Sequence, residues 1–471
     1  MNHHTLCFLR NDLRLQDNLL IEKAIDLNNQ IIFVYIFDDN EKPKKGGASQ
    51  WWLHYSLLSF SENLSKNLNA KLILKKGNVI EILKILCEKY SIKNLIHSEG
   101  FGEYLVQRDL KIENFCREKK ISLYKINNSS LLNYDEIKKD DGSFYKVFTP
   151  FWKNLVLKNS HFIRKNNYNL ENLKILKIYK NESDDLDDWN LLPKKPNWAK
   201  NFQWKIGENE ALKKWKNFSQ KQIYEYKEKR NFPWDDGVSK LSPHFAFGEI
   251  APWRIFFDCQ KILKNNLSSI QVDSIHCFLS EIGWREFSYY LLKYNPNLQN
   301  ENFNKKFDNF EWDWNSEFLE RWQSGATGYP IVDASMKQLW ETGWMHNRCR
   351  MIVGSFLTKN LLIDWRFGEK YFWDTLIDAD IASNSAGWQW ISGSGADAAP
   401  YFRIFNMKLQ SEKFDEDCIF IKKFLPQLKN FSSKEIHEIE IENKNYFKPI
   451  VDLKESSKKA LDRYKKLKSI N

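Results

Sequence analysis

The spacing of apolar residues changes once along this chain, and that change constrains the fold more than any other feature. Up to about residue 130, short apolar runs alternate with stretches of helical spacing. The apolar runs are Thr5–Leu9, Ile31–Phe37, Lys71–Leu74, Asn94–His97 and Ser122–Ile126, and the helical stretches include Gln50–Leu68, Val79–Tyr90 and Leu105–Lys119. Buried strands that alternate with helices form βαβ units around a parallel sheet. Residues 1–130 therefore predict a Rossmann-like α/β domain.

Beyond Glu208 the spacing is helical and strand signals nearly vanish. The predicted helices are Glu208–Phe218, Trp253–Leu263, Val272–Lys293, Tyr329–Thr342 and Asn347–Lys359. Residues 131–200 show little periodicity and are rich in Asn, Lys and Asp, which predicts a long interdomain linker. Residues 201–471 then form an all-α domain. The Lys-rich stretch Lys454–Lys468 predicts a helix or tail whose charges are solvated.

Several classes of protein are excluded by missing patterns. The seven cysteines contain no CxxC pair and their number is odd, which favours a reducing compartment over a disulfide framework or a metal cluster. The chain shows no apolar run near the roughly 18 residues that span a bilayer. HExxH, GxSxG and GxxxxGK motifs are absent as well. We expect a soluble, cytoplasmic protein without a metal ion.

Aromatic content and charge permit certain ligands without choosing one. The chain has 19 Trp, 19 Tyr and 33 Phe, and such residues stack flat ligands as well as filling cores. Its net charge of +10 suits a polyanion such as nucleic acid. A bias toward lysine produces the same charge with no ligand involved, so this evidence alone leaves both interpretations open.

Two segments present polar groups beside aromatic ones at helical spacing. In WMHNRCRM, a helix would place Trp344, Asn347, Arg348 and Met351 on one face, which indicates a lined pocket rather than an apolar stripe. Arg350 would point elsewhere and need its own partner, and His346 is best interpreted as structural. The alternative is a polar helix end packed under other helices.

In EIGWR, Glu281, Trp284 and Arg285 share a helix face and could hydrogen-bond a ring edge, stack a base and hold an anion. The alternative for this segment is a surface Glu–Arg pair beside a core tryptophan.

Two further segments could contact a cofactor. Within thirteen positions the chain places Asp378, Asp380, Asn384, Trp388 and Trp390. Gly393, Gly395 and Ala398 formally match a dinucleotide motif, but no strand–turn–helix unit flanks them, so we reject that match. Ser239, Lys240, Leu241 and Ser242 follow a glycine and could present N–H and hydroxyl groups to a pyrophosphate. An ordinary turn before a helix would explain them equally well.

Together these segments resemble the photolyase/cryptochrome family over nearly the whole chain. The resemblance is carried by long motifs, among them FLRNDLRLQDN at Phe8–Asn18, TGYPIVDASM at Thr327–Met336, GWMHNRCRM at Gly343–Met351 and DAAPYFRIFN at 397–406. It best fits class I photolyases that act on cyclobutane pyrimidine dimers. The fold implied is an α/β domain joined by a linker to an all-α FAD-binding domain.

The resemblance implies a folded-back FAD in the helical domain. Cofactor contacts are implied for Tyr226, Ser239, Lys240, Leu241, Ser242, Arg285, Asn347, Arg350, Asp378, Asp380 and Asn384. Arg350 and Asp378 would form an ion pair beside the flavin, and Asn384 would face its N5 atom. Val238 replaces a threonine of the family, which removes one phosphate contact.

The resemblance also implies contacts to a flipped-out dimer in UV-damaged DNA. They fall on Arg230, Glu281, Trp284, Asn347, Arg348, Met351, Trp390 and Gln410. Glu281 would stabilise the dimer radical anion, so it is a catalytic residue together with Asn384. Trp284 and Trp390 would wall the pocket. An unpaired, distorted dimer is easier to extrude than a normal base pair, which contributes to selectivity.

The implied reaction is driven by light. Reduced anionic FAD would pass an electron to the dimer, the cyclobutane bonds would split, and the electron would return. Trp388, Trp365 and Trp312 match the electron-transfer triad that refills an oxidised flavin. The protein would supply binding, orientation and electrostatics, act as a monomer and need no obligate protein partner.

Two alternative functions and the identity of the antenna chromophore remain open. A six-four photolyase would carry a histidine where Asn347 stands, and a cryptochrome would signal without repairing. Tyr104 and Leu105 replace the Asn and Glu of folate-using relatives. The antenna chromophore is therefore a folate, a deazaflavin, another group or none.

Overall fold

A five-stranded parallel sheet forms the amino-terminal part of the computed structural model, which describes residues 3–158, 160, 163, 168–178, 182–397, 402–439 and 446–469. The strands are β1 (His4–Leu9), β2 (Gln30–Phe37), β3 (Leu72–Lys76), β4 (Ile92–Ser98) and β5 (Ser122–Ile126), in the order β3-β2-β1-β4-β5. Every neighbouring pair is parallel. The predicted Rossmann-like sheet is confirmed, with each strand within two residues of its expected place.

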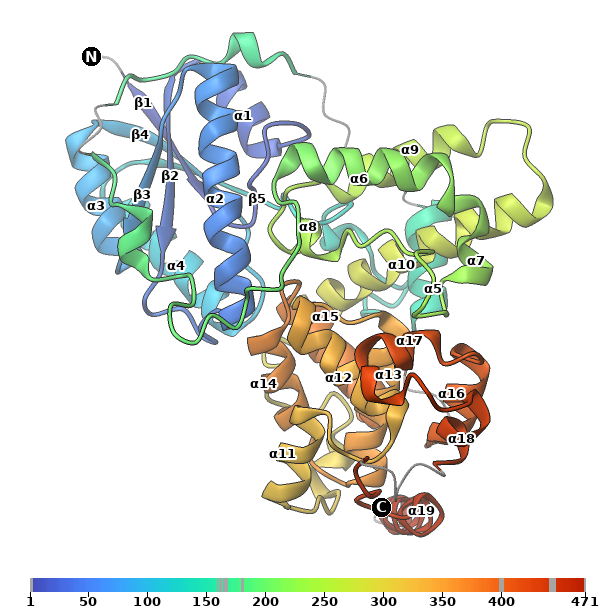
Figure 1. The fold of residues 1–471 in the computed structure, drawn as a ribbon. Coiled ribbons are helices and arrows are strands. Elements are labelled where there is room, and N and C mark those ends of the chain that lie inside the picture. Colours follow the sequence, from blue (N-terminus) through green and yellow to red (C-terminus); the bar gives the residue numbers. More distant parts are fainter. Residues whose placement is uncertain are drawn as a thin grey trace.

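Helices cover both faces of this sheet (Figure 1). They are α1 (Leu19–Leu27), α2 (Gly47–Leu68), α3 (Val79–Lys89) and α4 (Glu103–Glu118). Alternate side chains of a strand point to opposite faces, so Cys7 and Leu9 pack with α1 and α2, whereas Leu6 and Phe8 pack with α3 and α4. The strand order reverses between β1 and β4, which opens a crevice at their carboxyl ends.

The segment between residues 131 and 200 joins the two domains and packs closely against both. It contains η1 (Tyr134–Glu136), α5 (Phe148–Lys153), η2 (Asn154–Lys158), η4 (Leu170–Asn172) and η6 (Leu186–Trp189). Leu131, Tyr134 and Phe151 are buried in the core of the helical domain. Ile175 forms a bridge to Ile31 of β2. This segment therefore contributes to the cores on both sides of the joint.

The rest of the chain is helical, as predicted. Its elements are α6 (Glu208–Gln220), η7 (Gln222–Glu225), α7 (Tyr226–Lys229), α8 (Ser242–Ala246), α9 (Pro252–Ile262), α10 (Ser269–Tyr294), η8 (Lys305–Asn309), α11 (Ser316–Ser324), α12 (Pro330–Thr342), α13 (Asn347–Ser355), η9 (Phe356–Asn360), α14 (Trp365–Thr375), α15 (Ile381–Ser392), α16 (Met407–Phe414), α17 (Ile419–Phe424), η10 (Pro426–Leu428), α18 (Ser433–Glu438) and α19 (Leu453–Ser469). The 26-residue helix α10 packs against α7, α15 and α5.

The break between the predicted helices Tyr329–Thr342 and Asn347–Lys359 is confirmed, but the expectation that Trp344 shares a helix face with Asn347 is wrong, because Trp344 lies in the turn between α12 and α13. Helix α12 ends at Thr342, and its C-cap Gly343 has a φ of 67°, the left-handed conformation that glycine adopts without strain. Helix α13 begins only at Asn347, where the His346 side chain accepts a hydrogen bond from the Arg348 N–H and caps the helix. Helix α13 also ends at Ser355, earlier than predicted, and continues as the π-helical turn η9.

The predicted Lys-rich helix near the carboxyl end is confirmed as α19, and most of its lysines are exposed as expected, but some of its cations are also paired. Helix α19 buries Ala460 and Leu467 against the helical domain. Its cations form ion pairs, with Lys459 and Arg463 at 2.7 and 2.8 Å from Asp313 and Lys466 at 2.7 Å from Glu311. Apolar burial and these pairs together dock the helix.

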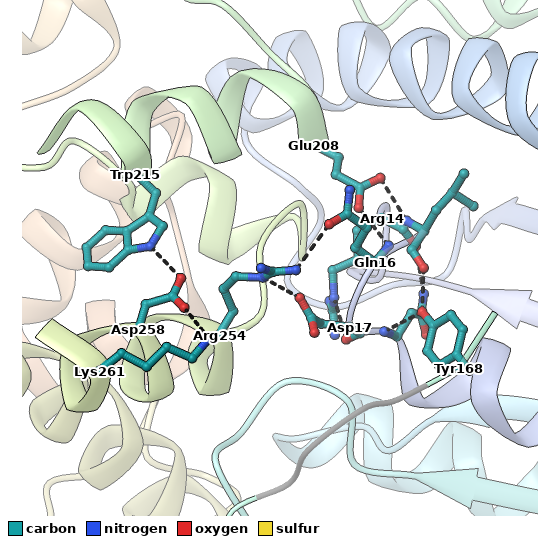
Figure 2. A network of polar contacts seen from close by, with 11 residues as sticks. Arg14, Gln16, Asp17, Tyr168, Glu208, Trp215, Arg254, Asp258 and Lys261 are labelled. Carbon is teal, nitrogen blue, oxygen red and sulfur yellow. Dashed lines mark hydrogen bonds and ion pairs between the residues drawn. The ribbon is translucent and has the colours of Figure 1, made fainter. Parts of the chain in front are cut away.

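Buried polar contacts connect the two domains (Figure 2). Arg14 is 2% exposed and donates to backbone carbonyls of Gly248 and Asn128, at 2.9 and 3.0 Å. Glu208 of α6 accepts from the backbone N–H groups of Leu15 and Gln16. Unpaired buried charges would be costly, so this network favours one relative placement of the domains. Among the described residues, no helix is both long and apolar enough to span a bilayer.

Candidate functional site

A cavity of about 570 Å³ lies in the helical domain, between the α7–α8 segment, α10, α13 and α15. That size is within the usual range of small-molecule and cofactor sites. Most of the residues singled out from the sequence line it, namely Tyr226, Arg230, Ser239, Lys240, Leu241, Ser242, Glu281, Trp284, Arg285, Asn347, Arg350, Met351, Asp378, Asp380, Asn384, Trp388 and Trp390. The fold thus brings four distant segments to one site.

Donors gather on one side of the cavity, in the loop that leads into α8. Ser239, Lys240 and Ser242 line the cavity there, and Trp344 Nε1 donates to Ser242 Oγ at 3.2 Å. Lys240 has a φ of +50°, an uncommon conformation for a non-glycine residue. Hydroxyl, ammonium and backbone N–H groups in such a loop suit an anionic ligand.

Arg285 adds a fixed cation to the site. It donates to Ser129 O at 2.7 Å and to Glu286 Oε1 at 2.9 Å. Glu286 is fully buried and also accepts from Leu131 N at 2.8 Å and Tyr134 OH at 3.0 Å. Burial raises the pKa of the Glu286 carboxyl, and Arg285 opposes that shift. The segment after β5 therefore helps to orient Arg285.

Carboxylates lie on another wall of the cavity. Arg350 Nη2 is 2.7 Å from Asp378 Oδ2, so the ion pair that the family resemblance implies is present. Asp378 Oδ1 is buried and has no hydrogen-bond partner in the described part of the chain. Asp380 caps α15 through the Ser383 N–H and also accepts from Tyr289 OH. An N–H donor on a ligand would satisfy the free oxygen of Asp378.

The amide of Asn384 is held by Glu369. Its Nδ2 donates to Glu369 Oε1 at 2.9 Å and to Glu369 O at 3.0 Å. Since both amide hydrogens point to Glu369, the Asn384 carbonyl oxygen is the atom left for a ligand. Burial raises the pKa of Glu369 to about 7. The sequence offered no signal for Glu369, which lies 15 positions away on α14.

Glu281 faces the cavity together with Arg230. Their side chains form an ion pair at 2.5 Å, and Arg230 Nη1 also lies 3.2 Å from Cys277 Sγ. Burial raises the pKa of Glu281, and the Arg230 charge opposes that shift. The alternative of a surface pair between Glu281 and Arg285 is not seen, because Arg285 pairs with Glu286.

Of the three tryptophans assigned to electron transfer, Trp388 alone lines the cavity. Trp365 is fully buried and its Nε1 donates to Asn302 Oδ1 at 2.9 Å, while Trp312 is half-buried and packs against the same cluster. Buried Trp322 contacts Trp388 edge to face at 6.1 Å. The sequence offered no signal for Trp322, because a lone tryptophan on α11 is indistinguishable from an ordinary core residue.

Two predicted DNA contacts do not line the cavity. Arg348 Nη2 donates to Asn231 Oδ1 at 2.6 Å, and its guanidinium lies 4.2 Å from the Phe414 ring centroid. Gln410 is on α16 with its buried Oε1 lacking a partner among the described residues. Because neither side chain lines the cavity, a DNA-contacting role for them stays a prediction. Ala398 of the rejected glycine motif lies outside the described residues.

A second, smaller cavity of about 80 Å³ lies between the domains at the crevice beside β1 and β4. Arg10, Tyr104 and Arg108 line it, and it shares Asp380 with the main cavity. Tyr104 OH donates to Asp38 Oδ2 at 2.9 Å. Ligands of α/β domains bind at such crevices.

Comparison with known proteins matches both halves of the chain. Residues 5–165 match the family described as DNA photolyase, and residues 278–466 match the FAD binding domain of DNA photolyase. The deoxyribodipyrimidine photo-lyase of Agrobacterium fabrum is 39% identical, with 98% of each chain covered. The Escherichia coli protein of the same name is 33% identical, over 92% of this chain and 91% of that protein.

Solved structures agree in fold. A bacterial class III photolyase from Agrobacterium tumefaciens superposes with a TM-score of 0.91 at 38% identity, over 100% of this chain and 98% of that one. A Synechocystis cryptochrome gives 0.87 at 26% identity, over 99% and 100%. An archaeal photolyase from Sulfolobus tokodaii with two FAD molecules gives 0.83 at 27%, over 98% and 100%. The class I assignment from the sequence motifs stays a prediction.

Proposed function

Since this chain belongs to the DNA photolyase family, we propose that it is a deoxyribodipyrimidine photo-lyase that splits cyclobutane pyrimidine dimers in DNA with light. The observation that carries this proposal is the composition of the main cavity. Its lining includes Glu281, Trp284 and Trp390 as well as Asp378 and Asn384. Groups suited to a pair of damaged bases and groups suited to a flavin therefore share one cavity.

The residues of the cavity fit FAD. Ser239, Lys240 and Ser242 offer donors to its phosphates, and the unpartnered Asp378 Oδ1 can accept a hydrogen bond from the N–H edge of a flavin ring. When bound and reduced, FAD supplies the light-driven electron that opens the cyclobutane ring. Asn384, fixed by Glu369, presents an uncharged acceptor to the ring system.

Glu281 and the two tryptophans then act on the dimer. Trp284 and Trp390 offer flat apolar faces to a flipped-out pair of bases, whose extrusion is eased by their broken stacking. Glu281 binds the polar edge of the dimer, and the positive charge of Arg230 at 2.5 Å favours a developing negative charge nearby. The apolar side chains around them exclude water.

The chemistry of residues 346 and 347 favours cyclobutane dimers over six-four photoproducts, whose repair needs a proton donor. Asn347 lines the cavity and carries an amide, which is not acidic. Its neighbour His346 is 1% exposed, and burial together with the nearby arginines lowers its pKa to about 3. A histidine that stays neutral at physiological pH does not donate a proton to the lesion.

We place an antenna chromophore, where one is bound, at the smaller cavity between the domains. The two FAD molecules of the Sulfolobus tokodaii structure show that a photolyase can hold a second flavin. At about 80 Å³ the cavity is smaller than most cofactor sites. Binding there requires side chains such as Tyr104 to move.

Replacing Glu281 with alanine should lower the rate of dimer repair about tenfold or more, since a hydrogen bond to a charged group contributes about 1.5–3 kcal/mol. FAD content should stay at the wild-type value, because Glu281 is not among the residues proposed to hold FAD. The measurement is the rate of thymine restoration at saturating lesion, beside a Glu301→Ala control on the surface. An unchanged rate would refute the role given to Glu281.

A further inference from the structure

Trp284, which lines the main cavity, stacks on a residue of the segment that joins the two domains. The Phe148 ring, at the start of α5, lies 3.9 Å from the Trp284 ring, centroid to centroid, with the planes 9° apart. Phe148 does not line the cavity, whereas Trp284 does. The stack therefore covers one face of the indole and leaves the other face to the cavity.

Apolar packing orients this indole, since no hydrogen bond of its N–H is found within the described part of the chain, and aromatic rings make up part of that packing. Phe287 contacts Trp284 edge-on at 6.0 Å, which restrains the indole from the side. Phe148 contributes the face-to-face contact. Without Phe148, the indole would lose the contact that fixes the tilt of its plane.

A second aromatic residue of α5 lies beside Phe148. The Trp152 ring is nearly parallel to the Phe148 ring, at 6.4 Å between centroids and 11°. A Cβ added to Gly283 would lie 2.7 Å from the Trp152 ring, so the absence of a side chain there is what lets Trp152 approach α10. Phe148 and Trp152 thus pack side by side against neighbouring residues of α10, Phe148 on Trp284 and Trp152 on Gly283.

Helix α5, which begins with Phe148, is held by contacts to the loop after α15 and to α10. The Phe148 N–H donates to Asp397 Oδ2 at 3.1 Å, in the loop that follows α15. Phe151 is fully buried and contacts Phe287 and Tyr290 of α10 at 5.2 and 4.8 Å. The position of Phe148 is therefore fixed by helices that carry other residues of the cavity.

We infer that Phe148 is a positioning residue for damage recognition, holding Trp284 in the orientation that stacks on a flipped-out dimer. This inference rests on the proposed function. It assigns to the connecting segment a part in distinguishing damaged from undamaged DNA. An indole already held in place binds a planar ligand without first losing rotational freedom, so the stack contributes to affinity through pre-organisation. Affinity for undamaged DNA comes from cationic side chains that neutralise backbone phosphates, and the ring stack carries no charge, so this affinity should not depend on it.

The test is the Phe148→Leu variant, with the dissociation constant measured in the dark for a single-stranded oligonucleotide with and without one thymine dimer. An aromatic stack contributes about 0.5–1.5 kcal/mol, so we expect the preference for the dimer to fall about two- to tenfold. Affinity for the undamaged strand, FAD content and repair yield at saturating lesion should all match the wild type. Phe148→Tyr, which keeps the ring, should restore the preference.

Phe144→Leu is the matched control. Phe144 lies in the same connecting segment and stacks on Tyr294 of α10 at 5.1 Å and 5°, but Tyr294 does not line the cavity. Its loss should leave the preference for the dimer unchanged. Trp152→Leu removes the ring beside Phe148 while retaining Phe148 itself, and should lower the preference less than Phe148→Leu does.

Two results would overturn the inference alone: a wild-type preference in Phe148→Leu, or an equal loss in Phe144→Leu. If Phe148→Leu also failed to hold FAD, a wild-type preference in Trp152→Leu would count against the support of Trp284 by the aromatic rings of α5. A wild-type protein without any preference for the dimer would instead contradict the proposed function, and the inference would fall with it.

Discussion

Replacing Glu286 with alanine is expected to lower the unfolding temperature by about 5 °C and to empty the FAD site, because removing one partner of a buried ion pair costs about 3–5 kcal/mol. Glu286 is 0% exposed and bonds Arg285, the Leu131 N–H and the Tyr134 hydroxyl. Without the Glu286 carboxylate, each of these three groups loses a hydrogen-bond acceptor. Arg285 then loses the contact that aims it at the cavity.

Thermal unfolding followed by circular dichroism, together with the flavin-to-protein absorbance ratio, measures both effects. Bound FAD stabilises the folded chain by mass action, so the variant and the wild type are also compared after FAD removal. Glu301→Ala is the control, since that exposed carboxylate pairs only with nearby side chains such as Lys305. Wild-type stability and FAD content in Glu286→Ala would show that Arg285 is oriented by other means.

Replacing Trp388 with phenylalanine is expected to reduce photoreduction of oxidised FAD to background. Trp388 is the member of the proposed triad that lines the cavity, whereas Trp365 and Trp312 lie behind it. Phenylalanine is much harder to oxidise than tryptophan, so the substitution removes the first step of electron supply. Repair by chemically reduced protein should remain, because that reaction needs no refilling of the flavin.

Flavin absorbance under blue light with an external reductant follows photoreduction directly. Trp340→Phe serves as the control, since Trp340 is 53% exposed and lies outside the cluster that holds Trp388. Photoreduction at the wild-type rate in Trp388→Phe would mean that electrons enter the flavin by another route. Loss of repair in the chemically reduced variant would assign Trp388 a structural role instead.

The sheet could be predicted from the sequence because each of its strands is a short apolar run between turn signals. Helix α1 was missed, since its nine residues follow a polar, loop-like stretch. The two helices on either side of Trp344 were predicted with nearly the observed bounds, but Trp344 was wrongly placed on the helix face of Asn347, because it lies between the C-cap Gly343 of α12 and the N-cap His346 of α13 within a spacing that looks periodic. Trp344 still lines the cavity, because the turn between the helices aims it there.

The candidate site also contains some residues that could be predicted from the sequence and others that could not. Residues that face the cavity could be named from motifs, because ligand chemistry selects unusual residue types such as paired carboxylates and amides. The residues behind them, among them Phe148, Glu286 and Glu369, could not. Each is an ordinary aromatic or acidic residue whose role arises from a contact between segments far apart in the chain, or from burial that the fold creates.

The most direct test of the account is light-dependent repair by the wild-type protein. Purified protein with photoreduced FAD is incubated with a thymine-dimer oligonucleotide under blue light, and restored thymines are counted against a dark sample. The account predicts restoration in the light, none in the dark, and no net consumption of reductant. Bound, reduced FAD without any restoration of thymines in the light would contradict it.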